Sequence, residues 1–307
     1  MQRSSGAPWA SHGLMVLAVA IVASSFPVGA AITHGLDPAP LTLLRFALAA
    51  LLFAPIVYFR HGLGWPTVRA LAHYALLSAC LVGFFWSMFL SLRYTSALNT
   101  GALFTLVPGL SSIFGAVLAG ERLGRHRLAA VGVGMVGALW VVFRGDPERL
   151  FALAFNVGDL IFLGGCLLFG VYGPLVKRLH GPAPTAVVTF WVLVTGTVWL
   201  ALLVNEGIWE TDWRAVDLSV FIGIGYLAVF STIVSFFLFQ HSTMRIGPTR
   251  VLAYTFLIPG LVLVIDWAAG NGLPPPMTLP GIAIVVAAMV VLQHGAGREG
   301  AARPAGR

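Results

Sequence analysis

The sequence predicts an all-α integral membrane protein with ten transmembrane helices, arranged as two inverted five-helix repeats. Three observations lead to this fold class. The chain of 307 residues is 58% hydrophobic and only 9% charged, with a mean hydropathy of +0.91. Its apolar residues fall in runs of about 20, the length of one membrane-spanning helix. Several short motifs recur in the same order in the two halves of the chain.

The apolar runs place the helices in order along the chain. We predict spans at residues 12–33, 39–59, 71–92, 97–118, 126–143, 156–176, 183–204, 218–241, 249–269 and 278–294. Segments such as LAAVGVGMVGALWVVF are apolar all round and lack the alternation of a membrane β-strand, so the helix is the spanning structure. The first run resembles a cleavable signal peptide. Because it has a counterpart in the second half, we expect it to be a retained helix.

The repeat is visible in matched motifs. The pairs, in order, are Gly13 with Gly158, PAPLTLLRF at 38–46 with PAPTAVVTF at 182–190, Ser87 with Ser235, and LVPGL at 106–110 with LIPGL at 257–261. We therefore divide the chain into a first five-helix repeat, 1–150, and a second, 151–307, which ends in a short cytoplasmic tail. An odd number of helices per repeat inverts the second copy. Secondary transporters use this construction to expose a central site to either side in turn.

The positions of Lys and Arg orient the chain. With both termini in the cytoplasm, 13 of the 18 Lys and Arg residues lie on the inner side. The five on the outer side are Arg45, Arg93, Arg144, Arg149 and Arg214. The net charge of +7 then reflects membrane topology, and no nucleic-acid partner is expected. We predict a multi-pass protein of the plasma (inner) membrane.

The motifs resemble those of a known family. The start P-A-P-x4-R-F of the second helix, L-x-P-G in the fourth and ninth, and GERL at 120–123 are similar to the EamA-type branch of the drug/metabolite transporter superfamily. Within that branch the chain looks most like amino-acid exporters of the YddG type. In the second half NGLPP at 271–275 replaces the Gly-Glu of the family pattern. The resemblance implies a central cavity lined by helices 1, 3, 4, 6, 8 and 9, and export of amino acids, aromatic ones included, or related metabolites.

Two prolines mark candidate helix breaks. Pro108 and Pro259 lie near the middles of helices 4 and 9 and offer no N–H to the carbonyls of Phe104 and Thr255. Freed carbonyls at a repeat interface can accept a hydrogen bond from a substrate ammonium group. The alternative is an ordinary kink satisfied by neighbouring side chains or water, as we also expect at Pro27.

Small, hydroxyl and aromatic side chains on shared helix faces are the candidates for lining a substrate cavity. They are Ser25, Trp86, Ser87, Thr100, Phe104, Ser111, Tyr226, Ser235, Tyr254 and Thr255. The alternative for each hydroxyl residue is plain helix packing. Asn99 is a candidate cap of helix 4. The acids inside spans, Asp159 and Asp266, are expected to be helix-end charges that face water.

Several classes of site are missing from the sequence. No cluster of His, Cys or carboxylate residues has metal-ligand spacing, no phosphate-binding loop occurs, and Cys80 and Cys166 give no disulfide framework. We therefore expect no cofactor and no metal. We also expect no enzymatic activity, although a membrane-embedded enzyme remains the alternative from another class.

The expected partners are a small-molecule substrate and the lipid bilayer, and the protein is expected to be a monomer. A nucleotide-sugar or sugar-phosphate carrier is the alternative transporter. Such a carrier needs cations in its cavity, whereas Arg45 and Arg93 are placed toward the outer boundary. Because Asp159 and Asp266 also lie toward that side, we expect a facilitator or exchanger without proton coupling.

Overall fold

The computed structural model describes residues 8–62, 64–120, 124–151, 154–179, 181–204, 211–246, 251 and 253–301, and all regular structure in these ranges is helical. The first half contains α1 (Pro8–Ile32), α2 (Pro38–His61), α3 (Val68–Ser91), α4 (Ala97–Phe104), α5 (Val107–Ala119), α6 (Arg125–Val142) and α7 (Pro147–Phe151). The second half contains α8 (Val157–Arg178), α9 (Thr185–Val204), α11 (Leu218–Ala228), η1 (Val229–Val234), α12 (Ser235–Ile246), η2 (Tyr254–Leu257), α14 (Ile258–Ala268), η3 (Pro276–Thr278) and α15 (Leu279–Ala301).

Seven helical segments among the described residues are long and apolar enough to cross a membrane. They are Ala10–Ile32, Pro38–His61, Val68–Ser91, Ala97–Leu118, Val157–Arg178, Thr185–Val204 and Leu218–Ile246. Three shorter apolar helices, Leu128–Val142, Tyr254–Ala268 and Pro276–Val291, occupy the places of the other predicted spans. The all-helical prediction is confirmed for the described residues, with seven long spans and three shorter helices in place of ten similar ones.

Side chains at helix starts explain several boundaries. The Ser96 hydroxyl accepts a hydrogen bond from the backbone N–H of Asn99 at 3.1 Å and so caps α4. The prediction that Asn99 caps this helix is therefore wrong, because the serine three residues earlier already fills that position. Asn156 and Asp159 form a reciprocal capping box at the start of α8.

The two L-x-P-G motifs coincide with interruptions of regular α-helix. The fourth span is divided into α4 and α5 at Thr105 and Leu106, and Pro108 lies in the first turn of α5. In the ninth span the 3₁₀ segment η2 passes into α14, and Pro259 again lies in the first turn. Pro27, by contrast, lies inside the continuous helix α1.

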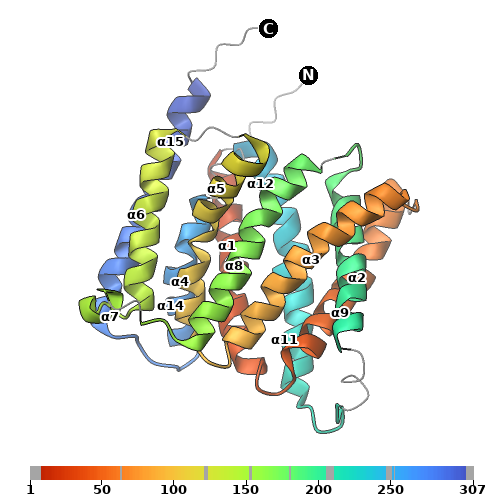
Figure 1. Cartoon of the computed structure of the whole chain (residues 1–307), viewed down its shortest axis with the longest axis horizontal. Helices are drawn as coiled ribbons and strands as arrows, with labels where there is room; N and C mark the ends of the chain where they lie inside the picture. The colour runs from red at the N-terminus through yellow and green to blue at the C-terminus, as the bar shows by residue number, and fades with distance from the viewer. Residues whose placement is uncertain are drawn as a thin grey trace.

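The helices run between two ends of the bundle (Figure 1). We call the end at which α1 begins and α15 ends the terminal face, and the end with the α1–α2 connection and α7 the loop face. α6 packs along α15, and α1 packs against α4, α11, α12 and α14. Gly137 of α6 and Gly281 of α15 cross at close range, since a Cβ built on either would lie 2.8 Å from the other's carbonyl oxygen. These two glycines are what allow α6 and α15 to approach.

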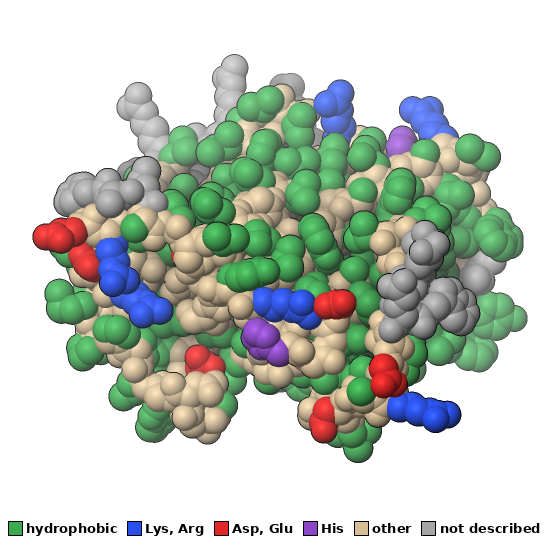
Figure 2. All heavy atoms as spheres, turned by 60° about the horizontal axis from the view of Figure 1, so that its bottom comes forward, with side chains coloured by type: hydrophobic (Ala, Val, Ile, Leu, Met, Phe, Trp, Pro, Cys, Tyr) green, Lys and Arg blue, Asp and Glu red, His purple; other side chains and the backbone are tan. Residues whose placement is uncertain are grey.

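The outer surface of the bundle is apolar. Large hydrophobic side chains on different helices are exposed, among them Leu51 (69%), Val117 (76%), Leu202 (67%) and Ile222 (63%). Figure 2 looks toward the loop face, where hydrophobic side chains surround a few acidic and basic groups. Apolar exposure on this scale is expected of a surface that faces lipid, because the same surface would be unfavourable in contact with water.

Candidate functional site

Five phenylalanine rings from four helices meet inside the bundle. Phe26 of α1 lies 5.9 Å from Phe104 of α4 and 6.1 Å from Phe162 of α8, measured between ring centroids. Phe84 of α3 lies 5.6 Å from Phe104, 5.7 Å from Phe162 and 4.5 Å from Phe169 of α8. We call these five residues the aromatic cluster. It joins helices from both halves of the chain, and four of its rings, those of Phe26, Phe84, Phe104 and Phe162, are buried.

A strip of hydroxyl groups joins α1 to the eighth span. The hydroxyls of Ser24 and Tyr226 are 2.6 Å apart, and Ser231 of η1 donates to the carbonyl of Ile21 at 3.1 Å. The next residue on α1, Ser25, donates to a carbonyl of its own helix. Polar groups and aromatic rings therefore occur on the same helix, α1, which carries both this strip and Phe26.

The broken spans carry the carbonyls identified from the sequence. Phe104 ends α4, and its ring belongs to the aromatic cluster, so its carbonyl lies at the break next to that cluster. Thr255 lies in η2 and is 8% exposed. Pro108 and Pro259 have no N–H with which to continue the α-helical ladder to these carbonyls.

Arg45 was overlooked as a site residue, and its side chain is buried. It is 1% exposed and extends from α2 toward η1, where its Nη2 and Nε lie 3.2 and 3.4 Å from the hydroxyl of Thr232. Its guanidinium carbon lies 4.1 Å from the ring centroid of Phe85. Thr232 is the middle residue of the 29-residue span Leu218–Ile246. The prediction that Arg45 belongs to the outer boundary is wrong, because its long side chain reaches mid-depth of the neighbouring span.

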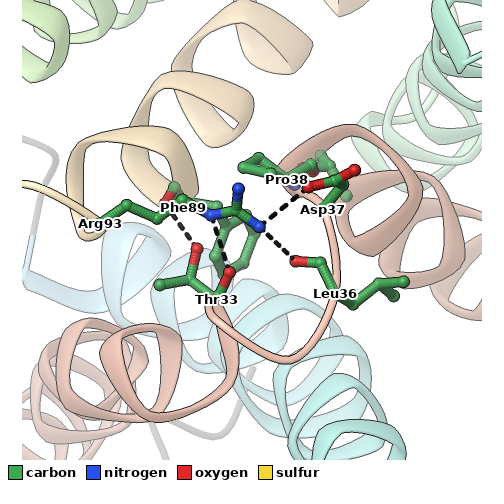
Figure 3. A network of polar contacts seen from close by, with 7 residues as sticks. Thr33, Leu36, Asp37, Pro38, Phe89 and Arg93 are labelled. Atoms are coloured by element: carbon green, nitrogen blue, oxygen red, sulfur yellow. Dashed lines mark hydrogen bonds and ion pairs between the residues drawn. The ribbon is translucent and has the colours of Figure 1, made fainter. Parts of the chain in front are cut away.

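A network on the loop face fixes the connection between α1 and α2 (Figure 3). The Arg93 guanidinium donates to the carbonyls of Thr33 and Leu36 at 2.9 and 3.1 Å and to the Asp37 carboxylate at 3.0 Å. The Thr33 hydroxyl donates to the carbonyl of Phe89 at 2.6 Å. These bonds tie the end of α3 to the α1–α2 connection and place Arg93 on the loop face. Its assignment to the outer side stays a prediction.

Asp159 forms a second network on the loop face, between the two halves. Its carboxylate accepts hydrogen bonds from the Thr95 hydroxyl at 2.7 Å, the Asn99 amide at 3.3 Å and the backbone N–H of Asn156 at 3.3 Å. Asp159 lies in the first turn of α8 as predicted, but it is only 2% exposed. The prediction that it faces water is wrong, because the turn after α3 and the first turn of α4 cover it. Asp266 is half-buried and accepts from Asn271 at 2.7 Å.

Other polar contacts mark the two ends of the bundle. The hydroxyl of Tyr254 lies 2.5 Å from Nδ1 of His12, which joins η2 to the first turns of α1 toward the terminal face. On the loop face, hydrogen bonds from the hydroxyl and the backbone N–H of Ser219 lower the pKa of Asp217, the N-cap of α11. The first contact joins elements distant in sequence, whereas the second is local to the start of α11.

The predicted cavity residues differ in what their side chains contact. Three of them contact other helices through their side chains: Phe104 in the aromatic cluster, Tyr226 in the hydroxyl strip and Tyr254 toward the terminal face. Those whose hydroxyls bond to carbonyls of their own helix are Ser25, Ser87, Thr100 and Ser235. Trp86 and Ser111 are half-buried, and Phe84 and Phe85 take the ring contacts expected of Trp86. The assignment of all ten to a cavity stays a prediction.

Sequence reasoning could have found part of what it missed. A charged residue inside an apolar span is itself a reason to expect a functional role, and Arg45 stands in the quoted motif PAPLTLLRF. Thr232 and the rings of Phe162 and Phe169 carry no comparable sequence signal, since their importance arises only from contacts between distant helices.

The described residues contain no group of three or more His, Cys, Asp or Glu side chains that could hold a metal ion. Cys80 and Cys166 are buried free thiols on α3 and α8. The chemistry available at the aromatic cluster and around Arg45 is therefore binding through rings, hydroxyls, carbonyls and one guanidinium.

Comparison with known proteins identifies the family. The sequence profile described as the EamA-like transporter family matches residues 9–143 and, a second time, residues 156–293. The chain belongs to the EamA-like transporter family. The family predicted from the motifs is thus confirmed, and this EamA-like protein is a multi-pass membrane transporter rather than an enzyme.

Relatives and a solved structure agree with this assignment. The uncharacterized transporter YyaM of Bacillus subtilis (strain 168) is 23% identical over 76% of this chain and 78% of its own length. A probable terminal-alkyne amino-acid exporter of Streptantibioticus cattleyicolor is 26% identical over 94% of both chains. A crystal structure that is 20% identical superimposes with a TM-score of 0.67 over 93% of this chain and 97% of the other, which shows a common fold.

Proposed function

We propose that this EamA-like transporter exports amino acids, aromatic ones included, and related small metabolites by alternating access. The observation that carries the proposal is the aromatic cluster, formed by helices of both halves beside a broken span. Rings of Phe26, Phe84 and Phe104 provide apolar contact for a side chain, and the hydroxyl strip on α1 provides polar contact. One relative carries the name of a probable amino-acid exporter, which supports the same substrate class.

Alternating access rests on the proposed repeat. We assign residues 1–150 and 151–307 to two five-helix repeats of opposite orientation. The family profile matches once in each half, both L-x-P-G motifs begin a new helical segment, and Gly137 and Gly281 lie 144 residues apart where α6 and α15 cross. Two similar halves can pack against each other in two ways of similar free energy, each exposing the shared site to one side.

Topology and assembly complete the proposal. The terminal face is assigned to the cytoplasm and the protein to the plasma membrane, since this orientation places 13 of 18 Lys and Arg residues inside. We assign a monomer, because the small-residue stripe of α6 is used within the chain: Ala130 and Ala138 are buried, and Gly134 faces the ring of Phe256.

Efflux from proteoliposomes tests the function. Liposomes that hold only this protein would be loaded in parallel with labelled phenylalanine, alanine, a nucleotide sugar and a sugar phosphate. We expect protein-dependent release of the amino acids, compared with empty liposomes. Release of the phosphorylated compounds without amino acids would instead assign the alternative transporter class, and release of none of the four would refute the proposal.

A further inference from the structure

Arg45 is a buried cation with incomplete bonding. Its side chain is 1% exposed, and its Nη1 has no hydrogen-bond partner among the residues that the structure describes. Its two contacts with the Thr232 hydroxyl, at 3.2 and 3.4 Å, are longer than the usual distance of about 2.9 Å. The guanidinium also lies over the face of the Phe85 ring.

No described carboxylate compensates this charge. The salt bridges formed within the described ranges join Arg93 to Asp37 and Arg149 to Asp146, all of them outside the buried region around Arg45. The buried carboxylate of Asp159 is occupied by Thr95 and its neighbours. A buried charge without a counter-ion is unfavourable, so it is retained where it has a function.

The acceptor that Arg45 does contact is weak and already engaged. The Thr232 hydroxyl donates its proton to the carbonyl of Leu227 at 3.0 Å, so a single neutral oxygen serves both guanidinium nitrogens. Thr232 lies in the π-helix η1, and such segments occur frequently at functional sites. An incoming anion can therefore displace this contact easily.

The second half of the chain shows that the position does not need a cation for packing. In the matched motifs, Thr189 takes the place of Arg45, while the following phenylalanines, Phe46 and Phe190, are both buried. The arginine is thus specific to one half, as expected for a group that recognises a ligand rather than one that holds two helices together.

We propose that Arg45 binds the carboxylate of the transported solute, an assignment that rests on the proposed function. The free Nη1 and the weakly held Nη2 can donate to the two carboxylate oxygens side by side. The ring of Phe85, which lies against Arg45, has its centroid 5.0 Å from that of Phe84 in the aromatic cluster. The apolar part of the solute therefore extends from Arg45 toward the aromatic cluster. One guanidinium balances the single charge of a carboxylate but not the two charges of a phosphate monoester.

Binding measurements on the purified full-length protein test this assignment. The probes are phenylalanine, phenylacetate, which lacks the ammonium group, and phenylalaninamide, which lacks the carboxylate. We expect phenylalanine and phenylacetate to bind to the unaltered protein more tightly than phenylalaninamide. Arg45→Gln should weaken the two carboxylates on the order of tenfold to a hundredfold, as for the loss of charge-assisted hydrogen bonds, and leave phenylalaninamide unchanged.

Two further variants guard against a folding defect. Arg69→Gln makes the same chemical change at an exposed arginine of α3 and should leave all three affinities unchanged. Thr232→Val removes the resting acceptor but keeps Arg45, so carboxylate affinity should rise severalfold, a result that a purely structural role does not give. If Arg45→Gln fails to fold, the Thr232→Val result decides.

The outcomes separate this inference from the proposed function. The assignment is overturned if the unaltered protein binds phenylalanine and phenylalaninamide with equal affinity. It is also overturned if Arg45→Gln still prefers phenylalanine to phenylalaninamide as strongly as the unaltered protein does. The assignment is also overturned if inorganic phosphate displaces phenylacetate at a lower concentration than acetate does. If carboxylate binding depends on Arg45 but the protein transports no amino acid in liposomes, the site is supported and the proposed function is refuted. If amino-acid transport is unchanged by Arg45→Gln, the function is supported and the site is refuted.

Discussion

Replacing Asp159 by asparagine tests whether the buried network on the loop face stabilises the protein. Asp159 accepts hydrogen bonds from Thr95 and Asn99 at one oxygen and from the backbone N–H of Asn156 at the other. An asparagine amide can keep its oxygen toward Thr95 and Asn99. Its NH₂ group then faces the N–H of Asn156, so two donors meet and the reciprocal capping bond is lost.

The expected cost follows from these contacts. Leaving one buried donor without an acceptor costs about 1–3 kcal/mol. Removing a negative charge from the N-terminus of α8 adds about 0.3–1 kcal/mol. The free energy of unfolding should therefore fall by about 1–4 kcal/mol.

Thermal unfolding in detergent measures this change. Asp266→Asn is the matched control, because Asp266 is half-buried near the end of α14 and its one bond, from Asn271, can pass to the amide oxygen. We expect a clear drop in the melting temperature for Asp159→Asn and almost none for Asp266→Asn. If Asp159→Asn has the same melting temperature as the unaltered protein, or if the melting temperature of Asp266→Asn falls further than that of Asp159→Asn, the reasoning about this network is refuted.

Three further outcomes are expected. Reporter tags at both termini should be accessible only from the cytoplasm, because 13 of 18 Lys and Arg residues then lie inside. An outside signal at one terminus alone would contradict the inverted repeat, and an outside signal at both would contradict the orientation. Phe104→Ala should reduce liposome export of aromatic amino acids more than of small ones, by up to about tenfold. Trp86→Ala should have a smaller effect because its ring lies outside the aromatic cluster, and equal losses for all solutes would indicate packing damage. An imposed pH gradient should not drive accumulation; accumulation that Asp159→Asn or Asp266→Asn abolishes would show proton coupling.

Much of the fold follows from the sequence because each apolar run forms a helix that does not depend on other segments for its backbone hydrogen bonds. A helix satisfies its own backbone hydrogen bonds, so length and hydropathy suffice to place it. The prolines of the L-x-P-G motifs marked both interrupted spans, since proline cannot donate to the helical ladder. The π-helix Val229–Val234 was not predicted, because the run VFSTIV carries no sequence signal that distinguishes it from ordinary α-helix.

The site followed from the sequence only in part. Phe104 was found because it precedes Pro108 in the same predicted span, whereas its partners Phe26 and Phe169 lie on other spans. Asp159 was assigned to water from its position at a helix end, but Asn99, distant in the sequence, covers it. Depth read along one helix is also a poor guide for a long side chain, as Arg45 shows by reaching Thr232.

The contacts that the described residues make at the two faces differ in strength, and this difference bears on the proposed direction of transport. Among the described residues, the loop face is held by the Arg93 and Asp159 networks, which include charge-assisted hydrogen bonds. The terminal face has the contact of His12 with Tyr254 and a hydrogen bond of 3.5 Å from the Arg178 guanidinium to the carbonyl of Leu118. An inverted repeat makes the two packings similar in free energy, so such local differences decide which face opens first. Of the contacts formed by the described residues, those at the terminal face are the weaker, so we expect that face to open at the lower cost. In the proposed orientation that face is cytoplasmic, where an exporter must first receive its solute.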